Sequence, residues 1–169
     1  MEDKHGIDKE HAHPRARELA PEEFFWDCSD ELAPFGSDEG DTALAEYREW
    51  RQENPEAPLI ECLSWTIESV GEIKFSEYSS AILSPTTVAK QVSDPAFNDQ
   101  QYVYTVDVSV IATGFGQLVD LGRIDADAKP PISLALERQI LWSQAQPDWT
   151  HAGEYINNLK VLQRILQSA

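Results

Sequence analysis

The chain has 169 residues, the usual size of one domain, and 41% of them are apolar, enough to form a core without disulfides or metals. Thirty acidic residues against thirteen basic ones give a formal net charge of −17, so we expect a basic protein as partner, and neither nucleic acid nor an anionic membrane. No apolar run approaches the roughly 18 residues of a membrane span, and the charged N-terminus does not resemble a secretory leader, so the sequence predicts a cytoplasmic protein.

The N-terminal part divides into an arm and the beginning of a helical domain. Residues 1–13 show no apolar period, which predicts a disordered or frayed arm, and residues 14–169 are expected to form a single helical domain. His13-Pro14 opens a short helix that ends near Ala20. A second helix is predicted from Pro21 to about Leu32, because proline and two glutamates occupy its first turn.

Two further helices have clear boundaries. Ser37 or Asp38 is expected to cap a helix that continues to Asn54-Pro55. The next helix is predicted over 58–71, where apolar residues repeat at helical spacing.

The middle of the chain fits more than one structure. Residues 72–100 are interrupted by two prolines and predict short helices or an irregular loop. Val106, Val108 and Val110 alternate with polar residues as in a strand, but helical spacing continues from them to Leu121. Because a strand here has no partner strand, we favour a helix over 103–121 and keep a short strand or hairpin near 102–112 as the alternative.

Two last helices complete the predicted fold. One begins at Pro130-Pro131 and stops before Pro147, and the other begins near His151. The sequence therefore predicts an all-α fold, a compact single-domain bundle of about six or seven helices, with α+β as the alternative.

No recognised catalytic or metal-binding pattern is present. His11 and His13 lack further ligands nearby, and 37–41 lacks the ligand spacing of a calcium loop. We therefore expect no metal, no cofactor and no catalytic residue. Cys28 and Cys62 are expected to be buried free thiols, and 114–116, Gly-Phe-Gly, to be a place of close helix packing.

The acidic residues are densest in 18–61, where only Arg48 and Arg51 are basic. Next to the aromatic run 24–26, these acids predict a non-enzymatic protein that binds a basic partner, for example an immunity-type inhibitor of a toxin. The alternative is an enzyme or metal-binding protein with a carboxylate site. The predicted partner-binding residues are Phe24, Asp27, Asp30, Glu31, Asp38, Glu39 and Asp41.

Several stretches are similar to the YfeS-like family of small uncharacterised bacterial proteins. They are FFWDC at 24–28, DELAPFGSDEG at 30–40, YREWR at 47–51, IATGFGQL at 111–118 and GRID at 122–125. The resemblance implies no activity. Some members of the family are linked with a nucleic-acid-associated Trp-Gly-Arg module, and that tripeptide is absent here.

Overall fold

The computed structural model describes residues 7–93, 99–146 and 148–169, and within these it contains seven α-helices and no strand. This confirms the predicted all-α bundle. The α-helices are α1 (Pro14–Leu19), α2 (Asp38–Glu53), α3 (Leu59–Gly71), α4 (Pro85–Ser93), α5 (Asp99–Leu121), α6 (Lys129–Ala145) and α7 (Ala152–Ser168). Short 3-10 helices join them: η1 (Lys9–His11), η2 (Glu23–Trp26), η3 (Phe75–Glu77), η4 (Ser80–Leu83) and η5 (Ala126–Ala128).

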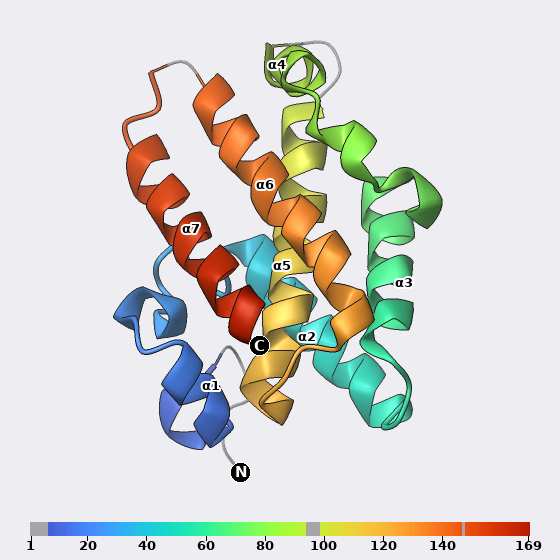
Figure 1. Ribbon diagram of the computed structural model, residues 1–169, viewed down its shortest axis with the longest axis vertical. Helices are drawn as coiled ribbons and strands as arrows, with labels where there is room; N and C mark the ends of the chain where they lie inside the picture. The colour runs from blue at the N-terminus through green and yellow to red at the C-terminus, as the bar shows by residue number, and fades with distance from the viewer. Residues whose placement is uncertain (1–6, 94–98, 147) are drawn as a thin grey trace.

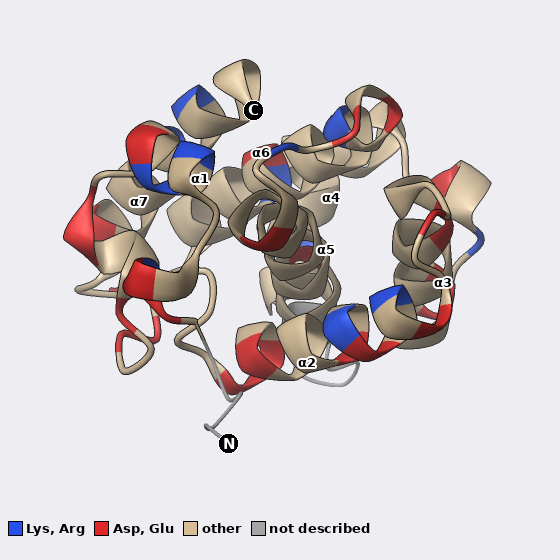
Figure 2. Cartoon of the chain, turned by 90° about the horizontal axis from the view of Figure 1, so that it is seen from below, with Lys and Arg blue, Asp and Glu red and all other residues tan. Residues whose placement is uncertain are grey.

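Helix α5 is the centre of the bundle. It contacts α2, α3 and α6, and α7 packs on α6 (Figure 1). Figure 2 looks nearly along α5 and shows the other long helices arranged around it. Every residue in 106–119 is buried, as expected of a helix that is covered on all sides.

The alternative of a strand or hairpin near 102–112 is wrong, because these residues belong to α5. The alternation of valines with polar residues has another cause. Asp107 and Ser109 are buried as well as the valines on either side, so the polar residues do not mark a solvent-facing side. Gly122 ends the helix with a φ of 77°, a conformation that favours glycine.

Two glycines let the neighbouring helices approach α5 closely, as the sequence predicted. A Cβ atom on Gly114 would lie 2.3 Å from Ile132 Cδ1 of α6, and one on Gly116 would lie 3.0 Å from Leu44 Cδ1 of α2. The small residues thus fix the distance of α5 from two of its partners.

Local sequence signals set the ends of α2 and α3. Ser37 Oγ accepts a hydrogen bond from Gly40 N–H at 3.0 Å, which confirms the predicted cap of α2. The predicted apolar stripe of α3 was Leu59, Leu63, Ile67 and Val70. The first three are fully buried, and Val70 is half-buried and packs against the core.

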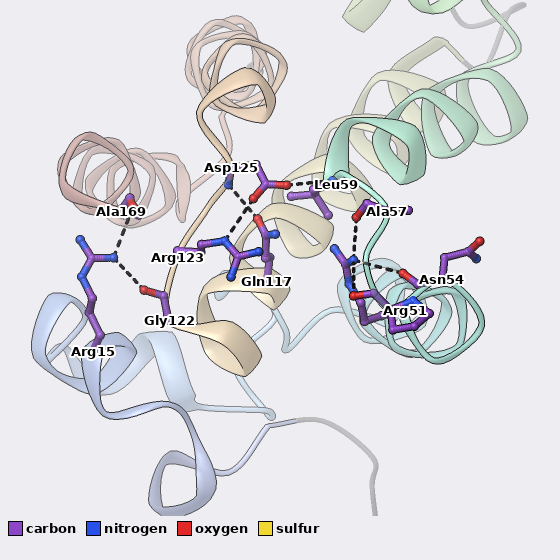
Figure 3. A network of polar contacts seen from close by, with 11 residues as sticks. Arg15, Arg51, Asn54, Ala57, Leu59, Gln117, Gly122, Arg123, Asp125 and Ala169 are labelled. Carbon is purple, nitrogen blue, oxygen red and sulfur yellow. Dashed lines mark hydrogen bonds and ion pairs between the residues drawn. The ribbon is translucent and has the colours of Figure 1, made fainter.

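A polar network at the C-terminal end of α5 connects this end to the start of α3 and to the end of α7 (Figure 3). Asp125 Oδ2 accepts a hydrogen bond from Leu59 N–H at the start of α3 at 2.9 Å, and Asp125 N–H donates to Gln117 Oε1 at 2.9 Å. Burial opposes ionisation of Asp125, but these bonds and Arg123 outweigh it and lower its pKa. Arg15 donates to Gly122 O at 2.7 Å and to main-chain oxygens at the end of α7.

Part of the predicted N-terminal arm is ordered. Residues 1–6 lie outside the described residues, whereas Ile7 and Ala12 pack with the core, which contradicts a frayed arm over 7–13. Ala12 is buried, and His13 N–H donates to Val119 O at 2.9 Å. Arg17 holds the segment by donating to Lys9 O and Glu10 O.

His13 is expected to contribute to stability as the N-cap of α1. Its Nδ1 accepts a hydrogen bond from Arg15 N–H at 3.1 Å, so His13→Ala should lower the free energy of unfolding by about 0.5–2 kcal/mol. His151 is the matched control, because it is the N-cap of α7 but makes no side-chain cap hydrogen bond. Urea unfolding of both variants measures the difference, and equal losses would contradict the assigned role of His13.

The predicted helix over 21–32 is also wrong in its extent. Only η2 is helical there, and turns follow it to 36. Asp27 Oδ1 accepts from Ser29 N–H at 2.9 Å, and Asp30 Oδ1 accepts from Leu32 N–H at 2.9 Å. Such local side-chain hydrogen bonds compete with helix formation.

Residues 72–100 were predicted to form either short helices or an irregular loop, and the described part of this segment contains short helices. Helices η3, η4 and α4 occupy most of 75–93, whereas 94–98 lie outside the described residues. Within the described residues, no helix is long and apolar enough to cross a membrane.

Candidate functional site

An open groove of about 1080 Å³ lies at the end of the bundle where α5 and α7 begin and α6 ends. We call it the acidic–aromatic groove. It is lined by residues of four regions: Ser29, Asp30, Glu31 and Leu32 of the loop after η2; Glu39 of α2; Tyr104 and Thr105 of α5; and Trp142, Gln146, Asp148, Trp149, His151, Glu154 and Tyr155 of α6, α7 and the turn between them. Its volume is comparable with that of pockets that hold drug-sized ligands.

Four aromatic rings, each in contact with the next, form one side of the groove. The ring centroids of Tyr104 and Trp142 are 5.3 Å apart, those of Trp142 and Trp149 are 5.8 Å apart, and those of Trp149 and Tyr155 are 5.7 Å apart. Trp142 and Tyr155 are buried, with 8% and 5% of their surface exposed, whereas Tyr104 and Trp149 are half-buried. The accessible ring surface therefore belongs to Tyr104 and Trp149.

Carboxylates surround these rings. Five acidic residues line the groove, namely Asp30, Glu31, Glu39, Asp148 and Glu154, and no Lys or Arg is found among the described lining residues. Burial raises the pKa of Tyr104 above its ordinary value, and the nearby charges of Glu39 and Glu31 raise it further. The groove is thus a region of negative potential next to aromatic surface.

The loop that carries Asp30 and Glu31 is held by its own polar groups. Hydrogen bonds from the Ser29 hydroxyl and N–H lower the pKa of Asp27, so this carboxylate stays charged and keeps the turn. Asn158 Nδ2 of α7 donates to Leu32 O at 3.1 Å and joins the loop to the opposite side of the groove. The two walls are therefore connected by a direct hydrogen bond.

A buried polar network lies behind Tyr155. The Tyr155 hydroxyl donates to Gln139 Oε1 at 2.8 Å, and Gln139 Nε2 donates to Asp107 Oδ2 at 3.0 Å. Arg138 donates to both oxygens of Asp107 at 2.8 Å, and the Tyr78 hydroxyl donates to Oδ1 at 2.6 Å.

This network fixes the back wall of the groove from inside the core. Burial raises the pKa of Tyr78 and of Tyr155 well above the ordinary value, so both hydroxyls stay protonated and act as donors. Burial lowers the pKa of Arg138, but the charge of Asp107 outweighs this and raises it, so the guanidinium remains charged. The ring of Tyr155 is held in place by these contacts.

The structure brings only part of the predicted partner-binding set together. Asp30, Glu31 and Glu39 line the groove, whereas Phe24, Asp27, Asp38 and Asp41 are not among its lining residues. Phe24 is half-buried and packs against the core.

Asp38 and Asp41 belong to the same turn as Glu39 but do not line the groove. They are exposed in the first turn of α2, where negative charge stabilises the helix dipole. Figure 2 shows Asp and Glu positions around the outline of the molecule.

The sequence prediction missed the aromatic side of the groove and the acids next to it. Trp142, Trp149 and Glu154 come from the α6–α7 region, far in sequence from 18–61. The one sequence signal was Asp107, the single acid within the apolar stretch 103–119, because an acid at such a position requires a buried partner.

The two cysteines are in different environments. Cys62 is buried as predicted, and burial raises its pKa to about 11, which makes it unreactive. Cys28 is exposed, which contradicts the prediction for it. Among the described residues, no group of three or more His, Cys, Asp or Glu side chains could hold a metal ion.

No known family model, curated protein or solved structure matches this chain. The similarity to the YfeS-like family therefore stays a prediction, and the function has to be argued from the groove itself.

Proposed function

We propose that this is a non-enzymatic binding protein that holds a basic segment of a partner protein in the acidic–aromatic groove. The observation that supports this proposal is the combination of five carboxylates from separate parts of the chain with accessible tyrosine and tryptophan rings. Carboxylates attract Lys and Arg side chains over a distance, and aromatic faces bind the same cations at contact.

The concave form of the site favours an inserted segment of the partner. A basic loop or chain end would place its cationic side chains between Glu31 and Glu39 on one wall and Glu154 on the other. Inhibition of a basic toxin, in the manner of an immunity protein, is one use of such a groove. The alternative of a carboxylate enzyme or metal-binding protein remains a prediction from the sequence.

Removal of three groove charges is expected to slow association without loss of the fold. The change Glu31→Gln, Glu39→Gln and Glu154→Gln should lower the association rate of a peptide of mixed Lys and Arg about tenfold and flatten its salt dependence. Stopped-flow measurements from low to about 0.15 M salt test this, because the Debye length then falls to about 8 Å.

A matched triple change removes the same charge elsewhere. Glu49, Glu53 and Glu56 are exposed and do not line the groove, so their change to Gln should alter the rate only slightly. If both triple variants slow association equally, the net charge of −17 acts as a whole and the groove is not the site.

A further inference from the structure

The protein holds two of its own arginines against aromatic rings, and one of them against a carboxylate as well. Arg138 donates through Nε and Nη2 to the two oxygens of Asp107, each at 2.8 Å, and its Cζ lies 5.5 Å from the centre of the Tyr78 ring. Arg51 Cζ lies 4.7 Å from the centre of the Trp50 ring. A flat guanidinium is thus recognised by a ring face in both places, and in one by a two-oxygen contact as well.

The acidic–aromatic groove offers the same two kinds of contact at the surface. Tyr104 and Trp149 are half-buried, so part of each ring is accessible, and Glu31 and Glu39 act electrostatically on Tyr104. Neither Glu31 nor Glu39 forms an ion pair with a Lys or Arg among the described residues, so both carboxylates are able to pair with an incoming cation.

The two common cationic side chains differ in how well they fit such a site. A guanidinium is planar and weakly hydrated, stacks on aromatic rings, and donates two parallel hydrogen bonds to a carboxylate. A lysine ammonium is a strongly hydrated point charge that gains less from a ring face. We infer that the groove selects arginine over lysine in the basic segment it binds, an inference that rests on the proposed function.

The test compares hexa-arginine with hexa-lysine, two peptides of equal length and charge, by calorimetric titration at about 0.15 M salt. We expect the arginine peptide to bind the parent protein at least about tenfold more tightly. Trp149→Leu should remove most of this preference and affect the lysine peptide little. Trp65→Leu should retain the preference, because Trp65 is 51% exposed on α3 and does not line the groove. If Trp149→Leu does not fold, Tyr104→Leu removes the other accessible ring and gives the same comparison.

The outcomes separate this inference from the proposed function. Equal affinities of the two peptides for the parent would overturn the arginine selectivity and leave the proposed function intact. Binding of neither peptide would overturn both. If the preference for arginine persists in both Trp149→Leu and Tyr104→Leu, the two rings do not bind the guanidinium, and the inference is overturned.

Discussion

Replacing Asp107 by alanine is expected to lower the free energy of unfolding by about 3–5 kcal/mol, because Arg138 then keeps its charge in the core without a partner. Asp107 has no exposed surface, and Arg138 is 5% exposed. The carboxylate accepts four hydrogen bonds, two from Arg138 and one each from Tyr78 and Gln139. All of these donors lose their acceptor when the side chain is removed.

The surface pair of Arg48 and Asp120 is the matched control. Arg48 also donates two hydrogen bonds to one carboxylate, each at 3.0 Å, but both side chains are about one-third exposed. Asp120→Ala should therefore cost only about 0–1 kcal/mol. Urea unfolding compares the two variants. If the two variants lost similar amounts of unfolding free energy, burial would not make the pair of Asp107 and Arg138 more important to stability than the surface pair. Adding Arg138→Met to Asp107→Ala should recover part of the loss by removing the unpaired charge.

The second large effect is expected at Gly36, which closes the loop behind Asp30 and Glu31. A Cβ atom there would lie 1.9 Å from Asp30 O and 3.0 Å from Asp27 O, both main-chain atoms that are fixed by the turn. Gly36→Ala should therefore cost about 1–3 kcal/mol and displace the loop that forms one wall of the groove. Thermal unfolding measures the first effect, and affinity for the mixed basic peptide measures the second.

Gly153→Ala tests whether this result is specific to Gly36. An added Cβ on Gly153 meets no atom within 4 Å, and the residue is in the first turn of α7. This change should be neutral or stabilise the protein by up to about 1 kcal/mol, since alanine favours helix more than glycine does. A Gly36→Ala variant with parental stability and affinity would contradict the described loop.

The helices that were predicted well are those whose signals are local. Ser37 caps α2, the stripe Leu59, Leu63 and Ile67 is the buried face of α3, and Gly122 ends α5. In each case a few neighbouring residues determine the structure. The segment 21–32 was predicted less well, because Asp27 and Asp30 satisfy loop N–H groups that a helix would otherwise use.

The groove was only partly predictable, because tertiary packing assembles it. Charge density drew attention to 18–61, and three of the seven residues named there, Asp30, Glu31 and Glu39, line the groove. The aromatic side comes from α5, α6 and the turn before α7, and nothing in the spacing of Tyr104, Trp142 and Trp149 says that their rings meet. Their contacts depend on the crossing of helices far apart in the sequence.

The most direct test of the proposed groove is the response of the five tryptophans to a basic peptide. Each tryptophan contributes one indole N–H signal to a nitrogen–proton spectrum of labelled protein, and single Trp→Phe variants would assign these signals. Trp142 and Trp149 line the groove, whereas Trp26, Trp50 and Trp65 do not. If the groove binds the basic segment, addition of hexa-arginine at about 0.15 M salt should move the signals of Trp142 and Trp149 and leave the other three in place. A shift of the exposed Trp65 without any shift of Trp149 would contradict the proposal.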